Sequence, residues 1–284
     1  MKKYIKASLI IVPIVGVIFF AIRAHLKEIE LLTQFVEELK IYSVSDKDGD
    51  INLIRHGKNN DGGYVVSEKA FLESDALMGY GICEDISFED TFSLKYNKPS
   101  YGYDCGIRDI ARQSKQCHFI DECIGNEKFL NPDMTSSHKV ASFTKQIENA
   151  GLKNKKVFIK MDIEGAEYDA FDDILKHVQN ITGLVVEFHF TKTEEMPKAI
   201  QLLQNINKDF YLVHLHSNNC VHKKRQFSVQ NINGKLTKVL ELTFIHKSLV
   251  TKAEPMKDQN FPKTIDQPNC PLKPDNQFEL KFHS

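Results

Sequence analysis

Residues 157–167 read Val-Phe-Ile-Lys-Met-Asp-Ile-Glu-Gly-Ala-Glu. The first five residues form a nearly continuous apolar run, which is typical of a strand buried inside a sheet. The acidic residues Asp162, Glu164 and Glu167 follow at once, and Glu167 falls in the first turn of the helix that we expect from Ala166. We therefore predict a buried strand, a turn and a helix, with three carboxylates at the turn.

The sequence on both sides of this stretch alternates short β-like runs with helical patterns. This alternation is typical of a Rossmann-like, doubly wound α/β domain, a parallel sheet with crossover helices. The last two strands are joined by a polar loop that needs no helix, so this pair can be antiparallel. The expected strands are 51–55, 64–67, 76–81, 100–103, 118–122, 157–161, 184–188, 211–216 and 238–246, and the expected helices are 87–96, 136–150, 166–178 and 194–205.

Ligands of open α/β sheets lie beyond the carboxyl ends of the strands, where the strand order reverses. Gly79 and Gly81 end one expected strand, and two glycines in such a turn let the backbone approach a ligand closely. A tight turn without a ligand uses the same glycines. Asp104 follows the next strand, at a spacing where a carboxylate either binds the ribose of an adenosine cofactor or caps a helix.

A second group of polar residues lies where the following strand ends, at Glu187 and His189. Both would lie beside Asp162, and carboxylates that converge there are costly unless a cationic group binds them. The acidic residues could instead be helix caps and surface charges, and His189 could be a general base or a hydrogen-bonded structural histidine. We expect no metal site, because His214 and His216 lack a third ligand at close spacing.

Taken in order, these segments resemble the FkbM-type S-adenosylmethionine-dependent methyltransferases, especially the membrane-anchored branch of that family. The block Lys-x-Asp-x-Glu-Gly-Ala-Glu at 160–167 is the most specific part of the resemblance, which extends from about residue 51 to residue 247. The other matching segments are Arg55 with Asp61-Gly62-Gly63-Tyr64, Gly79-Tyr80-Gly81-Ile82 with Ser87-Phe88-Glu89, Tyr103-Asp104, Val186-Glu187-Phe188-His189, His216-Ser217-Asn218-Asn219 and Leu240-Glu241-Leu242-Thr243-Phe244.

The resemblance implies a class I methyltransferase fold, a seven-stranded sheet whose last strand is antiparallel. It also implies that S-adenosylmethionine binds over Gly79 and Gly81, with its ribose on Asp104 and its methyl group near Asp162. The usual first motif of the wider family, Asp-x-Gly-Ala-Asn-x-Gly, is replaced here by Gly-Tyr-Gly-Ile-Cys-Glu-Asp at 79–85. The resemblance therefore does not fix the individual cofactor contacts.

The activity that the resemblance implies is methylation of a small-molecule or glycan acceptor, and we predict O-methylation of a sugar or another hydroxyl. Methyl transfer is an in-line displacement at a sulfonium, so the enzyme aligns the acceptor and removes the proton of a hydroxyl. Asp162, Glu187 and His189 are the candidate catalytic residues. One alternative is a type II membrane glycosyltransferase, which would use the Asp-x-Asp pattern at Asp46 and Asp48. The other is a non-catalytic binding protein on a methyltransferase fold.

The amino-terminal segment is uncharged from Ala7 to Ile22 and follows three lysines. A membrane-spanning helix needs about 20 mostly apolar residues, and Arg23 makes the following sequence a poor signal-peptide cleavage site. We therefore predict an uncleaved signal-anchor, or transmembrane segment, over residues 1–25; a cleaved signal peptide and a buried core helix are the alternatives. The lysines favour a cytoplasmic amino end and a luminal or extracytoplasmic catalytic domain in a single-pass membrane protein.

The rest of the chain divides into three parts. We predict a juxtamembrane helix and an acidic loop over 26–50, the methyltransferase domain over 51–250, and an irregular, proline-rich tail over 251–284. The helix is expected to extend to Tyr42 and to pack on the domain.

Charge and cysteine content limit the partners and the compartment. Without residues 1–22, which hold three lysines and no acidic residue, the chain has 34 basic and 38 acidic residues, a net charge of −4. We therefore expect no nucleic-acid partner, because such binding requires a basic surface. Six cysteines, none in a Cys-x-x-Cys pair, permit three disulfides in an oxidising compartment. Asn180-Ile181-Thr182 is a glycosylation sequon that would matter there.

Overall fold

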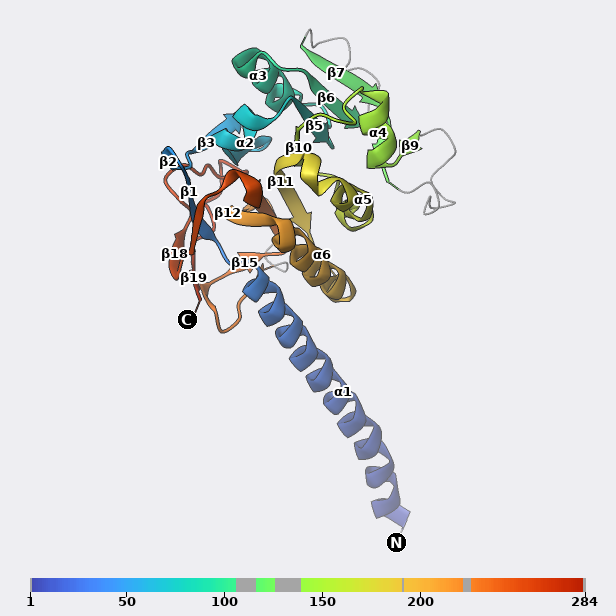
Figure 1. Cartoon of the computed structure of the whole chain (residues 1–284). Helices are drawn as coiled ribbons and strands as arrows, with labels where there is room; N and C mark the ends of the chain where they lie inside the picture. The colour runs from blue at the N-terminus through green and yellow to red at the C-terminus, as the bar shows by residue number, and fades with distance from the viewer. Residues whose placement is uncertain (1, 106–115, 126–138, 191, 222–225, 283–284) are drawn as a thin grey trace.

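A seven-stranded mixed sheet forms the centre of the computed structural model (Figure 1). The structure describes residues 2–105, 116–125, 139–190, 192–221 and 226–282, with the backbone alone described for residues 2–18, 20 and 193. The strand order is β12-β16-β11-β10-β5-β6-β7. These strands are β5 (Ala76–Tyr80), β6 (Ser100–Asp104), β7 (Cys117–Asp121), β10 (Val157–Met161), β11 (Ile181–His189), β12 (Phe210–Ser217) and β16 (Val239–His246).

The strand directions confirm the expected Rossmann-like sheet. Neighbouring strands from β11 to β7 run parallel, whereas β16 runs antiparallel to both β11 and β12. The chain passes from β5 outward to β6 and β7 and then returns to β10 on the other side of β5. The strand order therefore reverses between β5 and β10, which is where an open α/β sheet binds its ligand.

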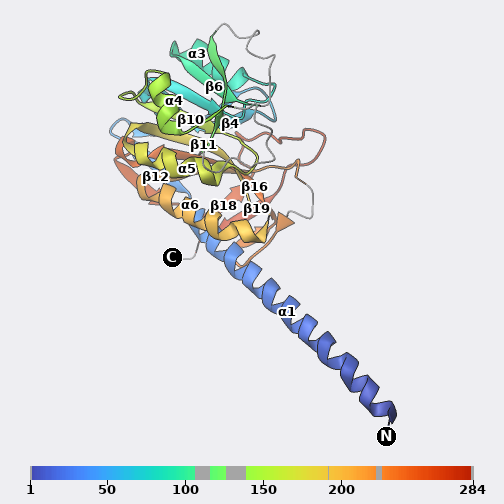
Figure 2. The ribbon, with the colours of Figure 1, turned by 90° about the vertical axis from the view of Figure 1, so that its right-hand side faces the viewer.

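Helices cover both faces of this sheet, because successive strand residues point to opposite sides. Met78 and Ile159 pack in the core of one face, together with residues of α4, α5 and α6, and Figure 2 shows α5 and α6 lying across that face. Leu77 and Phe158 pack in the core of the other face with residues of α2, α3 and β4. These elements are α2 (Glu68–Glu73), α3 (Ser87–Tyr96), α4 (Phe143–Asn149), α5 (Glu167–Ile174), α6 (Met196–Asp209), and the hairpin of β3 (Leu53–Gly57) and β4 (Gly63–Ser67).

Helix α1 (Lys2–Glu38) extends away from the domain, and its last turns pack against it (Figures 1 and 2). The Phe35 ring lies 4.3 Å from the ring of Phe190, and Glu28 forms an ion pair with Lys238 at 3.0 Å. The expected packing of the juxtamembrane helix is confirmed. Its expected end at Tyr42 is wrong, because the chain turns after Glu38 and Tyr42 begins a strand.

The amino-terminal anchor predicted over residues 1–25 lies largely outside the described side chains. Within the part of the chain that is described, no helix combines the length and the apolar character needed to cross a membrane.

The acidic loop expected over 43–50 is instead a hairpin of β1 (Tyr42–Asp46) and β2 (Gly49–Asp50). Val44 is buried on its inner side, and Gly49 has a φ of 131° that permits the turn. The tail strand β17 (Lys252–Pro255) pairs with the other edge of β1. The polar composition of residues 43–50 did not predict this hairpin, because β17, the strand that pairs with β1, lies about 200 residues further along the chain.

Several helix and strand boundaries differ from the sequence expectation by a few residues, and three of them have a clear physical reason. Helix α4 begins at Phe143, where the Ser142 side chain accepts a hydrogen bond from the Lys145 N–H, and residues 136–138 lie outside the described residues. Helix α5 ends at Ile174 and continues as a 3₁₀ segment, η3 (Leu175–Asn180). Strand β11 extends to His189, because β16 pairs with it along its whole carboxyl-terminal part.

The tail expected to be irregular is folded onto the domain. Strands β18 (Asp258–Phe261) and β19 (Phe278–Lys281) form a small sheet with β14 (Ile232–Gly234), and the Phe261 and Phe278 rings stack at 4.8 Å. A disulfide joins Cys220, just after β12, to Cys270 in the tail. The tail therefore forms part of the packed domain.

The cysteines form two disulfides among the described residues, Cys105–Cys123 and Cys220–Cys270, rather than the three that the even number permits. Cys83 and Cys117 lie outside the disulfides; Cys83 is exposed and Cys117 is buried. Burial raises the pKa of the Cys117 thiol to about 12. These two cysteines therefore lie in different environments: one thiol is inside the sheet and the other is on a surface turn.

The glycosylation sequon is largely closed in the folded domain. The Asn180 side-chain amide donates to the Lys155 carbonyl at 3.1 Å. Thr182 is 3% exposed, and its hydroxyl donates to the Val157 carbonyl at 3.2 Å. A glycan at Asn180 would have to be attached before β11 joins the sheet.

Candidate active site

A cavity of about 420 Å³ opens beyond the carboxyl ends of β5, β6 and β10, where the strand order reverses. It brings together three of the residues predicted from the sequence, Gly81, Asp104 and Asp162. Its location is the one that the doubly wound architecture favours for a ligand. The residues around it are Tyr80, Gly81, Cys83, Tyr103, Asp104, Cys105, Cys123, Ile124, Asp162, Ile163, Glu164 and Ala166.

Gly81 is required by the contact between two turns. Its φ is 71°, and a Cβ at this position would lie 1.5 Å from the Asp162 carbonyl oxygen. The turn after β5 therefore touches the turn after β10 backbone to backbone. Gly79 is not among the cavity residues, because it faces α3 and a Cβ there would lie 2.0 Å from Glu89 Oε1. The structure thus places only Gly81 of the predicted pair at the cavity.

Asp104 ends β6 and fixes the loop that follows Gly81. Its Oδ2 accepts a hydrogen bond from the Cys83 backbone N–H at 2.9 Å. Cys83 has a φ of 51°, so the loop bends back over the end of β6. The carboxylate to which the family resemblance assigns a ribose lies at the cavity wall.

Lys160 and Glu89 are two buried ionisable residues on the elements that carry the cavity, and the sequence assigned neither a role. Lys160 is 6% exposed and donates to the Gly81 carbonyl at 2.9 Å. Glu89 is 1% exposed, and within the described chain neither of its oxygens has a hydrogen-bond partner. Burial, only partly offset by the charge of Lys160, raises the pKa of Glu89 to about 7.

Asp162 and Glu187 lie together at the inner end of the site. The Tyr64 hydroxyl donates to Asp162 Oδ2 at 3.1 Å, and Asp162 Oδ1 is buried without a hydrogen-bond partner among the described residues. Glu187 accepts a hydrogen bond from the Asn218 amide at 2.6 Å. Burial and the neighbouring carboxylates of Asp162 and Glu241 raise the pKa of Glu187 well above its usual range, which favours the neutral form of this carboxyl group.

His189 completes this group from the end of β11. Its Nδ1 lies 3.0 Å from Glu167 Oε1, and its Nε2 lies 3.5 Å from Glu164 Oε2 and 3.9 Å from Glu187 Oε2. Burial opposes protonation, but the hydrogen bond to Glu167 and the nearby acidic charges raise the pKa of His189. The structure thus brings the three predicted catalytic residues, Asp162, Glu187 and His189, into one cluster.

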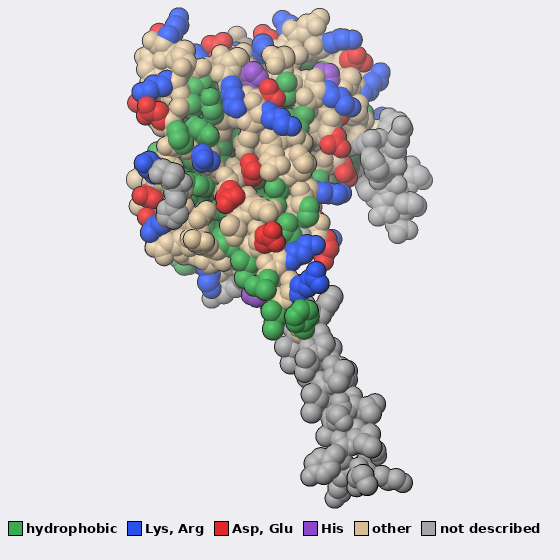
Figure 3. All heavy atoms as spheres, turned by 60° about the horizontal axis from the view of Figure 1, so that its bottom comes forward, with side chains coloured by type: hydrophobic (Ala, Val, Ile, Leu, Met, Phe, Trp, Pro, Cys, Tyr) green, Lys and Arg blue, Asp and Glu red, His purple; other side chains and the backbone are tan. Residues whose placement is uncertain are grey.

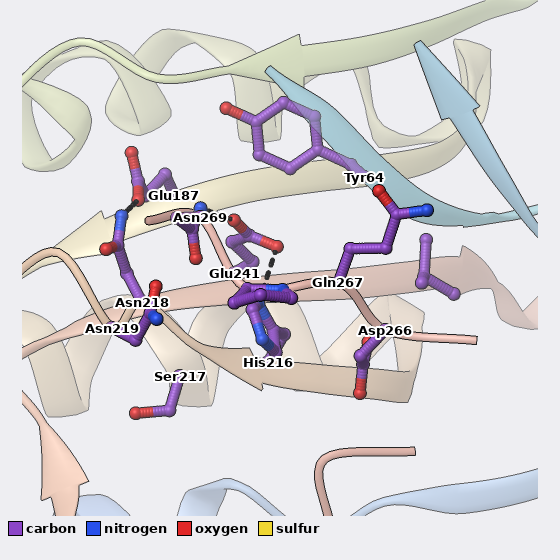
Figure 4. A network of polar contacts seen from close by, with 12 residues as sticks. Tyr64, Glu187, His216, Ser217, Asn218, Asn219, Glu241, Asp266, Gln267 and Asn269 are labelled. Carbon is purple, nitrogen blue, oxygen red and sulfur yellow. Dashed lines mark hydrogen bonds and ion pairs between the residues drawn. The ribbon is translucent and has the colours of Figure 1, made fainter. Parts of the chain in front are cut away.

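A network of polar side chains continues from Glu187 towards the tail (Figure 4). Asn269 donates to Glu241 Oε1 at 2.6 Å, and His216 lies between Glu241 and Asp275, at 3.2 and 3.1 Å. Burial opposes protonation of His216, but hydrogen bonds to the two carboxylates raise its pKa to about 10. His216 therefore serves as a buried cation that joins the sheet to the tail.

The remaining histidine considered as a metal ligand, His214, forms an ion pair with Asp266 of the tail at 2.8 Å. The sequence could not place the tail residues in this network, because they follow no periodic pattern. The sequence contains only a weak indication that Asn218 and Glu241 are functional: both lie in segments that carry the family resemblance.

The Asp-x-Asp pattern lies in the β1–β2 hairpin, and its side chains do not line the cavity. Asp46 accepts a hydrogen bond from the Asp48 N–H at 2.8 Å and forms an ion pair with Lys69 at 2.7 Å. These contacts account for Asp46 as a turn residue.

Residues 135–220 match the family model for the methyltransferase FkbM domain. This match supports a methyltransferase. The matched region contains the Asp162 block, Glu187 and His189. No curated protein matches the chain at a significant level.

Two solved structures show distant similarity. One is a fibrillarin/Nop5p complex, with a TM-score of 0.35, 9% identity, and coverage of 75% of this chain and 98% of that chain. The other is the plantazolicin methyltransferase BpumL in complex with SAH, with a TM-score of 0.27, 8% identity, and coverage of 63% and 81%. These TM-scores are too low to support an assignment.

Substitution of Gly81 should test the contact between the two turns. Gly81→Ala should lower the free energy of unfolding by about 1–3 kcal/mol more than Gly151→Ala, measured by urea denaturation. Gly151 is a matched control, because its φ of 72° equals that of Gly81 within a degree while a Cβ there meets nothing within 4 Å. Equal losses would mean that the turns are not in contact.

The ion pairs of His216 predict a defined pH dependence. The pKa of His216 is raised from 6.5 to about 10, so its stabilising effect is complete below pH 6.5 and is lost as the pH rises through 10. The difference in unfolding free energy between the wild type and His216→Gln should therefore be larger at pH 6 than at pH 10. The exposed His118 provides a surface control, His118→Gln, which should have little effect at either pH.

Proposed function

We propose that this protein is an S-adenosylmethionine-dependent methyltransferase that methylates a hydroxyl group of a small-molecule or glycan acceptor. The observation that carries the proposal is the cavity at the strand-order reversal, which has Gly81, Asp104 and Asp162 in its wall. The family-model match over residues 135–220 supports the same reaction class.

In this proposal the cofactor occupies the cavity between the turns after β5, β6 and β10. Asp104 accepts hydrogen bonds from the ribose hydroxyls, as a carboxylate after the second strand does in doubly wound folds. The backbone at Gly81 has no side chain that would block the methionine part. The carboxylates of Asp162 and Glu164 lie in the same wall and favour a cationic sulfonium.

The acceptor hydroxyl approaches from the side of Glu187 and His189. Its oxygen forms a bond to the methyl carbon while the bond between that carbon and the sulfonium sulfur breaks, and its proton passes to a nearby base. Asp162 is the best-placed base, because its Oδ1 has no hydrogen-bond partner among the described residues. Glu187, held neutral, then stabilises the site as a hydrogen-bond donor.

Asp104→Asn tests the cofactor assignment. Hydrogen bonds to a charged group contribute about 1.5–3 kcal/mol, so the affinity of the full-length protein for S-adenosylhomocysteine should fall about ten- to a hundred-fold in calorimetry. Asp121→Asn is the matched control, because Asp121 pairs with Asp104 in register on the neighbouring strand but lies outside the cavity wall. The proposed function is wrong if the wild type binds no S-adenosylhomocysteine up to millimolar concentration.

We also propose that residues 1–25 anchor the protein in a membrane as a single pass, with the catalytic domain outside the cytoplasm. Two disulfides among the described residues are typical of an oxidising compartment. Hydrophobic side chains gather where α1 leaves the domain (Figure 3), and Phe19, Ile22 and Leu26 are each more than half exposed. Apolar exposure of this kind is typical of a surface that another apolar phase covers.

Alkaline carbonate extraction should leave the full-length chain in the membrane pellet. Ile14→Arg should release it, since a charge at the centre of the span costs about 2.5–3.5 kcal/mol, whereas Gln34→Arg in the exposed surface of the stalk should not. A tag placed after Ser284 should be protected from protease in sealed vesicles. Extraction of the wild type would refute the anchor, and digestion of the tag would refute the orientation.

A further inference from the structure

We propose that Asp162, Glu164 and His189 bind a divalent metal ion at the edge of the cofactor cavity. Each residue offers one donor atom, and the three atoms all lie within 4.8 Å of one another. A cation held about 2.1–2.4 Å from each donor needs donors at most about 4.8 Å apart, so the cluster has a suitable size. The sequence alone did not predict this set of ligands, because the third one, His189, comes from another strand.

The second observation is a buried carboxylate oxygen without a hydrogen-bond partner among the described residues, next to a ring nitrogen that has only long contacts. His189 is 8% exposed, and its Nε2 lies 3.5 Å from Glu164 Oε2 and 3.9 Å from Glu187 Oε2. Asp162 Oδ1 is buried without a partner within the described part of the chain. A buried acceptor without a partner is costly unless something binds it, and the His189 ring nitrogen and the Glu164 carboxylate lie within 4.8 Å of this acceptor group.

The other ring nitrogen of His189 is held by a carboxylate, an arrangement that is common in histidines that bind metals. His189 Nδ1 lies 3.0 Å from Glu167 Oε1, and Glu167 is fully buried. A histidine that ligates a metal usually donates its other ring N–H to a carboxylate, which fixes the tautomer and the ring orientation. Glu167 therefore holds Nε2 in the direction of Asp162 and Glu164.

The charges of the cluster favour a cation. The carboxylates of Asp162, Glu164 and Glu167 lie around His189, and no lysine or arginine among the described residues forms an ion pair with any of them. One imidazole and two carboxylates make a mixed nitrogen and oxygen donor set, which suits Mn²⁺ or another divalent first-row cation better than an all-oxygen Mg²⁺ site.

The role of the ion rests on the proposed function. Asp162 and Glu164 line the cofactor cavity, while His189 and Glu187 lie on the acceptor side. An ion held there would bind the acceptor oxygen, lower the pKa of the acceptor hydroxyl so that its proton passes to bulk water, and orient the oxygen towards the methyl group; Asp162 would then act as a ligand and not as the base. This selects acceptors with two adjacent oxygen atoms, such as the vicinal hydroxyls of a sugar, because both oxygens can bind one ion.

The test is a titration of the full-length protein with MnCl₂, followed by the room-temperature electron paramagnetic resonance signal of free Mn²⁺. The wild type should remove about one equivalent of this signal. Glu164→Gln and His189→Gln should each weaken binding by about ten-fold or more. Glu164 is the cleaner position, since its side chain is 86% exposed and its substitution should not disturb folding.

Glu254→Gln is the matched control, because Glu254 lies on β17 with its side chain 66% exposed. It should bind Mn²⁺ as the wild type does. The metal site is refuted if the wild type leaves the free signal unchanged, or if Glu164→Gln binds Mn²⁺ as tightly as Glu254→Gln. Circular dichroism melting establishes that each variant is folded.

Calorimetry with S-adenosylhomocysteine in the presence of a chelator separates this proposal from the proposed function. Cofactor binding without Mn²⁺ binding would refute the metal site and leave the methyltransferase proposal standing. Mn²⁺ binding that depends on Glu164, without any cofactor binding, would refute the methyltransferase proposal and leave the metal site standing.

Discussion

The contact on which the site depends is the approach of the Gly81 turn to the backbone of Asp162. A side chain at residue 81 would overlap the Asp162 carbonyl, so the two turns are as close as two backbones can be. This closeness leaves the cavity between the turns and the end of β6, and it places Asp162 within reach of both the cavity and β11. The position of every other candidate residue follows from these adjoining strand ends.

Electrostatics then determine what such an arrangement can bind. Acidic side chains from the turn after β10, from α5 and from β11 meet around a single imidazole, and the buried ones receive few hydrogen bonds. Removing carboxylates from water costs free energy, and the attraction of a bound cation offsets this cost. A sulfonium and a metal ion both satisfy this condition, which is why the same cluster supports the proposed reaction and the proposed ion.

Much of the fold could be predicted from short-range pattern. The apolar run before Asp162 and the alternation of strands and helices predicted the sheet. The loop before β16 indicated that this strand could be antiparallel. Asp104, Asp162, Glu187 and His189 could be placed because residues that follow parallel strands share one edge.

The errors arose where a distant partner decides the local structure. Gly79 looks like a ligand-binding glycine until α3 brings Glu89 against it. The acidic segment before Asp50 becomes a hairpin only because β17 pairs with it, and β11 extends to His189 only because β16 does so. The tail gave no periodic signal, since it is held by a disulfide and by side-chain hydrogen bonds rather than by an apolar face.

The folded tail has a consequence for the synthesis of the protein. Glu241 and His216 emerge from the ribosome well before Asn269 and Asp275, the residues that satisfy them in the native interior. Until those residues have been added, Glu241 and His216 have each other as partners but lack the contacts that the tail supplies. The polar network of the interior is therefore completed only after residue 275 has been synthesised.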